Sequence, residues 1–204
     1  MISIAAIVEG DGEVQAVPLL LRRLAHSLGS WEVECLRPAP LARAKIPREP
    51  DLKKHIELQA RRTGPGGIIV ILLDADDDCP ANLGPKLTSW AYEQRPDRRF
   101  VVSVIPREFE AWFLASADSL RGQRGLSPML SPPTKDPETI RDAKGWLSAT
   151  MPRRYRPTLD QAPLAACFDL QAARSCPSFE RFVQRFAAAL QCDEVPDCLG
   201  KLRS

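Results

Sequence analysis

The sequence predicts an α/β fold with a mostly parallel four-stranded sheet, helices flanking it, and a helical C-terminal extension. Three segments (residues 2–8, 68–73 and 100–105) have the continuous apolar, β-branched character of strands buried on both faces. Segments with helical apolar spacing alternate with them, which favours a parallel sheet with right-handed crossovers. All three apolar segments also end in acidic residues, and this pattern carries the functional prediction.

The first half of the predicted sheet follows from residues 2–62. Residues 2–8 form the first strand, and residues 13–28 form a helix because their apolar side chains recur at helical spacing. The alternating residues 31–36 predict a second strand. Residues 37–50, rich in proline and arginine, predict a loop, after which Asp51 caps a helix that continues to about residue 62.

The second half of the predicted sheet begins after a glycine-rich turn. Residues 68–73 form the central third strand, and residues 83–94 form a helix whose start is obscured by Gly84 and Pro85. Residues 100–105 form the fourth strand, and a short helix at residues 109–117 follows. These elements predict a first domain over residues 1–120.

The remaining residues, 121–204, are predicted to form a helical extension that packs on the first domain. Helices are expected at residues 136–148, 164–173 and 178–190, with a basic, irregular stretch at residues 151–163. The apolar stripe of the last helix is a core face rather than a cofactor site.

Composition excludes several classes of protein. The chain has 204 residues and a net charge of +2, so charge alone does not indicate a nucleic-acid binder. Two histidines and six cysteines without a Cys-x-x-Cys pair argue against structural zinc. Without a basic leader or an apolar run of about 20 residues, we expect a cytoplasmic protein with reduced thiols and no membrane contact.

The first acidic motif, Glu9-Gly10-Asp11-Gly12-Glu13, lies at a predicted strand-to-helix junction. Its glycines allow a tight turn and close backbone approach, and Glu9 and Glu13 would flank that turn. The alternative is a simple turn whose acidic residues favour the helix start. The motif does not complete the glycine pattern of a dinucleotide-binding site.

The second motif, Asp74-Ala75-Asp76-Asp77-Asp78, follows the most apolar strand. Four neighbouring carboxylates repel one another unless a cation offsets their charge. Asp74 and Asp76 would project from one side of an extended segment, because side chains alternate along such a segment. An exposed acidic loop is the alternative, and a calcium EF-hand is excluded by the missing glycine and glutamate.

The third motif places Glu108 and Glu110 on either side of Phe109, and either glutamate could complete an acidic cluster. Ligands bind beyond the carboxyl ends of strands in an open α/β sheet, so acids from three strands would meet there. Carboxylate oxygens favour a hard cation, here Mg²⁺ or Mn²⁺. The alternative is a pair of polar residues at a helix start.

Basic residues supply candidates for phosphate binding. Arg153 and Arg154 could grip a phosphate, Tyr155 could stack on a base, and Arg107 lies beside the third motif. Lys144, on a predicted helix, could reach a phosphate. Solvated surface positions are the alternative for all of these residues.

The motifs resemble those of Toprim domains. Val8-Glu9-Gly10-Asp11-Gly12-Glu13 is similar to their glutamate motif, and Asp74-Ala75-Asp76 to their Asp-x-Asp motif. The run from Arg107 to Leu114 resembles that of DUF4276, a family of small bacterial proteins, and the tail with Tyr155 and Asp160-Gln161 fits the same family.

The resemblance implies a Toprim-like, Rossmann-like fold and Mg²⁺-dependent phosphodiester chemistry. By position, Glu9, Asp74 and Asp76 would be catalytic, Glu13 would match an extra acid of the nuclease branch, and Glu110 or Glu108 a further ligand. It also implies a nuclease of the overcoming-lysogenization-defect type acting in phage defence on RNA such as tRNA, or on DNA. An ABC-type or AAA ATPase partner and a homodimer are further implications.

Two other functions compete with a nuclease. A non-catalytic metal- or nucleotide-binding module could regulate an ATPase by docking on it. A phosphatase of the haloacid-dehalogenase type also places Asp-x-Asp after a strand. That family needs a hydroxyl or β-branched residue soon afterwards, where this chain has Asp77 and Asp78.

Overall fold

The computed structural model describes residues 1–42 and 48–191. Part of the predicted loop at residues 37–50, and both Cys192 and Cys198, lie outside the described residues. The strands are β1 (Ile2–Val8), β2 (Val33–Cys35), β3 (Ala39–Pro40), β4 (Ile68–Asp74) and β5 (Arg99–Ile105). The longer helices are α1 (Asp11–Ser27), α2 (Glu49–Thr63), α3 (Pro80–Gln94) and α8 (Pro177–Gln191).

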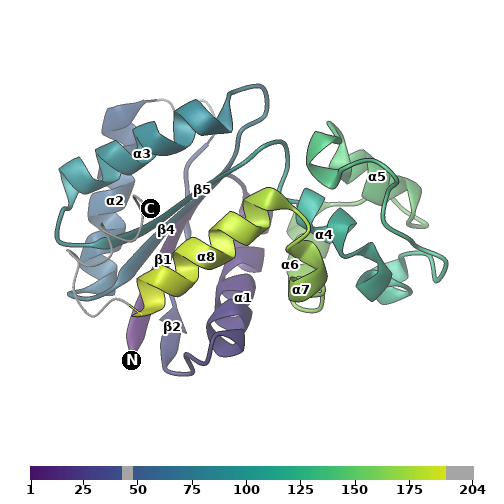
Figure 1. Ribbon diagram of the computed structural model, residues 1–204, viewed down its shortest axis with the longest axis horizontal. Coiled ribbons are helices and arrows are strands. Elements are labelled where there is room, and N and C mark those ends of the chain that lie inside the picture. Colours follow the sequence, from purple (N-terminus) through teal and green to yellow (C-terminus); the bar gives the residue numbers. More distant parts are fainter. Residues whose placement is uncertain (43–47, 192–204) are drawn as a thin grey trace.

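Between β5 and α8 the chain forms short helices and turns. They are α4 (Ala111–Ala115), α5 (Ala143–Ala149), α6 (Pro157–Ala165) and α7 (Leu170–Ala173), with 3₁₀ segments η2 (Ala117–Leu120), η3 (Gln123–Gly125) and η4 (Pro137–Thr139). In Figure 1 they gather at one end of the molecule, beyond the sheet.

The strands form one sheet in the order β2-β1-β4-β5, in which the strands pair in parallel, and β3 also pairs with β1. The predicted α/β class is therefore confirmed. The described sheet has five strands rather than four, because the segment after β2 returns to β1 as β3. Ile2 pairs with Val33 and Ile7 with Ala39, so the register shifts by one residue between β2 and β3.

Alternating side chains of the strands build two cores, one on each face of the sheet. Ile4, Val70 and Leu72 face the core shared with α1 and α8. Ile7, Ile69 and Ile71 face the core shared with α2 and α3. Figure 1 shows these helix pairs on opposite sides of the strands, so the central strands are covered on both faces as their composition predicts.

The C-terminal segment completes the larger core. Phe179 and Phe182 of α8 pack against Trp112 of α4, with ring centroids 4.8 Å and 5.6 Å from the indole. The Trp112 Nε1 group donates to Ser178 Oγ over 2.9 Å. The predicted boundary near residue 120 stays a prediction, and α8, from beyond it, packs on β5.

Several predicted helix limits are wrong, for identifiable reasons. The helix predicted at residues 136–148 is only η4 and α5, because Ile140 is extended and Asp142 caps a new helix by accepting from Gly145 N. The stretch predicted as irregular at residues 151–163 contains α6, which has Pro157 at its first position and Pro163 inside it.

Other predicted limits shift by a few residues. The helix predicted at residues 164–173 is divided between the end of α6 and α7, because Asp169 accepts from Gln171 N and Ala172 N and starts a new turn. The helix predicted at residues 83–94 starts earlier, at Pro80. In α2, Arg48 rather than Asp51 is the N-cap residue.

Cys35, Cys79, Cys167 and Cys176 are free thiols. Within residues 1–42 and 48–191, no helix combines the length and the apolar character that crossing a bilayer requires.

Candidate active site

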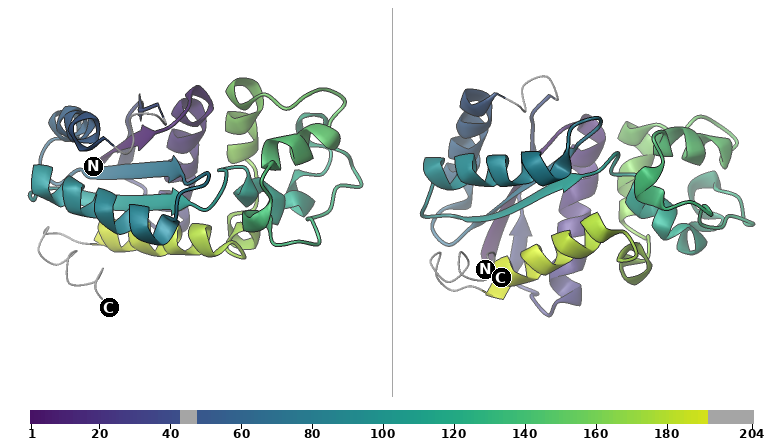
Figure 2. Two further views of the ribbon diagram at one scale, coloured as in Figure 1. Left: turned by 90° about the horizontal axis from the view of Figure 1, so that it is seen from above. Right: turned by 45° about the horizontal axis from the view of Figure 1, so that its top comes forward.

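The candidate site lies at the carboxyl edge of the sheet, where the chain changes direction between strands. From β1 the chain moves to β2 on one side, and it returns through α2 to β4 on the other, so β1 and β4 flank a topological switch point. In the left view of Figure 2 the strand arrows point toward the segments that follow β5. Glu9 follows β1 directly, and Asp74 is the last residue of β4.

Asp74 points toward the face that carries α1 because side chains alternate along β4. Leu72, two residues earlier, belongs to the core with α1, and Asp74 is only 7% exposed. Its backbone position is fixed on the other side by pairing with Ile105 of β5. The aspartate is therefore a buried carboxyl group at the end of β4, held by the pairing of β4 with β5.

Glu13 lies in the first turn of α1 and closes the turn that follows β1. Its Oε2 accepts from Gly10 N over 2.7 Å and from Glu9 N over 2.9 Å. The two backbone donors stabilise the start of α1 and fix the Glu13 carboxylate beside Glu9. Both glutamates of the first motif thus come from the same strand-to-helix junction.

The second glycine of this junction is required by α6. A Cβ atom on Gly12 would lie 2.8 Å from Pro157 Cβ and would also overlap Gln161, whereas a Cβ on Gly10 would meet only Glu13 Oε2 at 3.9 Å. Gly12 therefore allows α6 to pack on α1, close to Glu13 and Gln161.

This difference between the glycines gives a stability prediction. We expect Gly12→Ala to lower the free energy of unfolding by about 1–3 kcal/mol, since the overlap forces α6 away from α1. Gly10→Ala, whose backbone is extended at φ −123°, is the matched control and should change it little. Urea denaturation of both variants measures the difference, and equal losses in the two would contradict the packing explanation.

Glu110 is the most deeply buried acid of the site, with no exposed surface. Its Oε1 accepts from Tyr155 Oη over 3.0 Å and from Gln161 Nε2 over 3.3 Å, and Lys144 Nζ lies 3.1 Å from its Oε2. These groups hold the carboxylate in place and supply one positive charge. Of the two glutamates that the sequence left open, Glu110 is the one inside the cluster.

Glu108 has a different role, since its carboxylate anchors the start of α5. One oxygen accepts from Lys144 Nζ over 2.9 Å and the other from Lys144 N over 3.1 Å. Lys144 is thus shared between Glu108 and Glu110. Although burial lowers the pKa of this lysine, the charges of Glu110, Asp74 and Glu108 outweigh that effect and raise the pKa above its ordinary range.

Burial and neighbouring negative charges raise the pKa values of the acids at this edge of the sheet. Burial raises the pKa of Glu13 from 4.5 to about 7, and the negative charges of Glu110 and Glu9 add to the rise. Burial also raises the pKa of Asp74 well above its usual range, with Glu13, Glu110 and Glu9 contributing further. The pKa of Glu110 rises through burial, while Lys144 partly opposes the rise.

These shifts predict a pH dependence of stability. The folded chain keeps a proton on Glu13 up to pH 7, whereas the unfolded chain releases it near pH 4.5, so the folded state binds more protons in between. The free energy of unfolding therefore falls by on the order of 2 kcal/mol as the pH rises from 4.5 to about 7. We expect urea denaturation without divalent metal to show this loss in the wild type and a flatter profile in Glu13→Gln. A wild-type profile that rises over this range would contradict the cluster electrostatics.

Asp76 does not extend the row begun by Asp74. The chain turns after β4, and Asp76 is exposed with a left-handed backbone at φ 53°. The expectation that Asp74 and Asp76 project side by side from an extended segment is therefore wrong. Arg107 fixes this turn by donating to Asp76 O over 2.6 Å and to Asp77 Oδ1 over 3.2 Å.

The basic residues chosen from the sequence mostly have partners within the chain. Tyr155 is 3% exposed and donates to Glu110, so the expectation that its ring stacks on a base is wrong for this conformation. Arg153 pairs with the buried carboxylate of Asp160. Arg107 contacts the acidic turn, and Arg154 is exposed.

Sequence reasoning missed Gln161 and the role of Tyr155 in holding Glu110. The sequence signal for both residues is weak, because they lie in the stretch predicted to be irregular and are 45 and 51 residues from Glu110. The family resemblance includes Asp160-Gln161 but assigns the pair no role. Long-range contacts of this kind leave no periodic trace in the sequence.

The chain matches one known family of protein domains. The model of a domain of unknown function, DUF4276, matches residues 8–187. The chain belongs to this family. The match covers all the clustered acids, from Glu9 to Glu110, as well as Lys144 and Tyr155. Searches of curated proteins and of solved structures gave no match.

The donor chemistry of the DUF4276 site suits a hard cation, since the clustered acids offer carboxylate oxygens. Glu110 Oε2 is buried and makes no hydrogen bond, although Lys144 lies beside it. Within residues 1–42 and 48–191 no three acidic, histidine or cysteine side chains already form a group that could hold a metal. Glu13 and Glu110 are engaged by hydrogen bonds within the chain, so each carboxylate would have to turn toward a cation.

Proposed function

We propose that this DUF4276 protein is a metal-dependent, Toprim-type nuclease that hydrolyses phosphodiester bonds of RNA or DNA. One observation supports it above the others. Acids that follow β1, β4 and β5 meet at the switch point of a parallel sheet, where their burial and mutual repulsion raise the pKa values of Glu13 and Asp74. A buried group of like charges suits a cation as its partner.

Glu9, Glu13, Asp74 and Glu110 would hold Mg²⁺ or Mn²⁺, with Asp76 as a further candidate at the rim. When bound, the ion supplies Lewis-acid polarisation of the phosphate and makes a water molecule more acidic. Lys144 has its own part in this arrangement, because its ammonium lies between the cluster and Glu108. It would hydrogen-bond a phosphate oxygen and stabilise the charge that develops there.

The chain's own hydrogen bonds would keep the site in position. Tyr155 and Gln161 orient Glu110 from α6 and the residues before it, and the backbone amides of Glu9 and Gly10 orient Glu13. Arg107 holds the turn that carries Asp76 and Asp77. Such orienting contacts lower the cost of arranging ligands around a cation.

The test is cleavage of mixed tRNA, single-stranded DNA and plasmid by the purified chain in Mg²⁺, in Mn²⁺ and in EDTA. Cutting that needs the metal would support the nuclease and name its substrate class. Saturable metal binding without cutting of any substrate would instead favour a regulatory module that docks on an ATPase. The phage-defence role, the ATPase partner and a homodimer follow from the Toprim resemblance alone and stay predictions.

A further inference from the structure

A cavity bordered by α5 has the lining of a nucleotide site. It has a volume of about 720 Å³ and lies between α5 and the loop before it. Its lining includes Pro132, Pro133, Lys135, Ile140, Arg141 and Trp146. None of the described residues that line it is acidic. Cavities of this size and mixed character hold small molecules in many proteins.

One ion pair and one shared helix connect this cavity with the candidate active site. Arg141 Nη1 lies 3.2 Å from Asp77 Oδ1, in the turn that follows Asp74. Trp146 lies on α5, the short helix whose Lys144 reaches Glu108 and Glu110. The cavity therefore shares α5 and the turn after β4 with the candidate active site.

We infer that this cavity binds one nucleotide of a single-stranded nucleic acid, next to the phosphate that is cut. The base would stack on Trp146 between the apolar walls formed by proline and isoleucine, and Arg141 and Lys135 would contact the backbone phosphates. The inference rests on the proposed nuclease function and names the group that positions its substrate. Trp146, which lines the cavity, would then stack on the base in place of Tyr155, which is buried.

The state of Arg141 fits this assignment. Its side chain is 73% exposed, and its pair with Asp77 is open to solvent. Exposed ion pairs contribute little free energy, so a phosphate can displace the aspartate at small cost. Trp146 is partly buried against the main core, which restricts the ring to few orientations.

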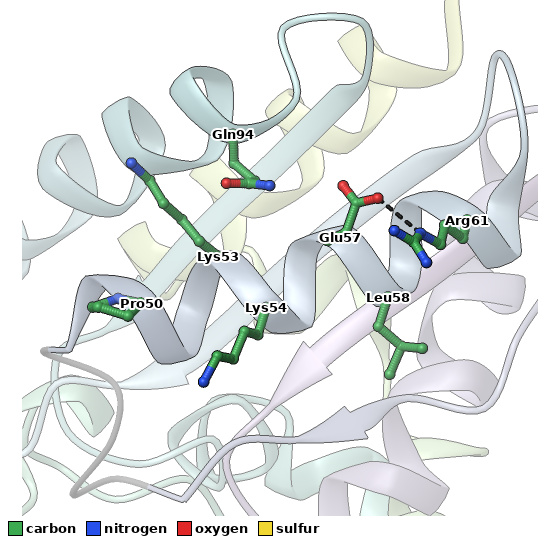
Figure 3. A pocket seen from close by; sticks show the side chains of 7 residues that line it. All are labelled: Pro50, Lys53, Lys54, Glu57, Leu58, Arg61 and Gln94. Carbon is green, nitrogen blue, oxygen red and sulfur yellow. Dashed lines mark hydrogen bonds and ion pairs between the residues drawn. The ribbon is translucent and has the colours of Figure 1, made fainter.

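Another cavity, on α2 and α3, provides a contrast. It has a volume of about 380 Å³, and Figure 3 shows Lys53, Glu57 and Arg61 among the side chains that line it. Unlike the first cavity it has an acid in its lining, Glu57, which pairs with Arg61, and Lys53 pairs with Glu49 and Glu93. No aromatic side chain lines it among the described residues.

The second cavity supplies a matched control. Arg61 is 75% exposed and paired, much like Arg141, but it lies on α2, away from the cluster. Trp31, 70% exposed near β2, serves as the control for Trp146. In the Asp74→Asn chain, which should not cut, the affinity for labelled single-stranded RNA and DNA oligonucleotides is measured by fluorescence anisotropy in Mg²⁺.

We expect Trp146→Ala to weaken oligonucleotide binding by about tenfold, the loss typical of one stacked base. Arg141→Ala should weaken it by a few fold and reduce its salt dependence, while Trp31→Ala and Arg61→Ala bind like the parent. A preference for RNA or for DNA identifies the nucleic acid. Quenching of tryptophan fluorescence by the oligonucleotide, absent in Trp146→Phe, gives a second readout in a variant that keeps the core packed.

Unchanged affinity in Trp146→Ala and Arg141→Ala would overturn the inference, as would a parent chain that binds neither oligonucleotide. Cleavage by the wild-type chain decides the nuclease function separately. Metal-dependent cutting together with unaffected pocket variants would therefore place the substrate elsewhere and leave the proposed function standing.

Discussion

Replacing Asp74 with asparagine should reduce metal-dependent cleavage by on the order of 10²- to 10³-fold, the usual cost of losing one group that stabilises reaction charge. Asp74 ends the central strand and lies within the electrostatic reach of Glu13, Glu110, Glu9 and Lys144. Asparagine has almost the same shape but cannot supply a negative charge to a cation. Cleavage rates of the two chains at equal Mg²⁺ concentration measure the effect.

The same change should leave the fold intact. Without metal, Asp74 is a buried carboxyl group among like charges, and its neutral replacement removes part of that repulsion. We therefore expect Asp74→Asn to be at least as stable as the wild type in EDTA. Asp118→Asn, an exposed acid paired with Arg121, is the matched control and should cut normally. Full activity in Asp74→Asn would defeat the assignment of the site.

Lys144→Met should give the largest loss of stability among the charged residues of the site, about 2 kcal/mol near neutral pH. The change leaves Glu110, which has no exposed surface, without the ammonium that lies 3.1 Å away. Because Lys144 is itself 36% exposed, the expected loss is smaller than for a fully buried pair. Urea denaturation measures it.

The sign of the pH dependence identifies the cause of that loss. Burial already raises the pKa of Glu110, and removing Lys144 raises it further, so the folded variant gains stability when Glu110 takes up a proton. The loss should therefore shrink as the pH falls toward 5, and a second change, Glu110→Gln, should restore stability at neutral pH. Lys54→Met, an exposed lysine of α2, is the control. A loss that does not change with pH or with Glu110→Gln would point to packing instead of charge.

The strands and most of the acidic cluster were predictable because both follow from local patterns. Buried parallel strands are continuously apolar, and acids placed after three of them must meet at one edge of the sheet. Glu9 and Glu110 accordingly help to raise the pKa values of Glu13 and Asp74 in the structure. The prediction for Asp76 was wrong because the turn after β4 takes a left-handed conformation at this residue. The alternation of side chains along a strand does not extend into such a turn.

The C-terminal segment was predicted less well, and α6, which lies in a stretch predicted to be irregular, is the clearest case. Pro157 occupies the first position of α6, where its missing amide hydrogen costs nothing. This helix packs on Gly12 of α1. Gln161, within the helix, and Tyr155, just before it, donate hydrogen bonds to Glu110. The packing of α6 on α1 depends on tertiary contacts that the local sequence does not encode.

The most direct measurement of the central proposal is Mn²⁺ binding by electron paramagnetic resonance, in the wild type and in Glu9→Gln, Glu13→Gln, Asp74→Asn and Glu110→Gln, with Asp118→Asn as control. We expect saturable binding by the wild type and the control, weaker by at least about tenfold in each of the four variants. Binding should also weaken as the pH falls below 7, since protons compete with the metal for Glu13. An absence of saturable binding, or binding that the four variants leave unchanged, would contradict the metal site on which the proposed function depends.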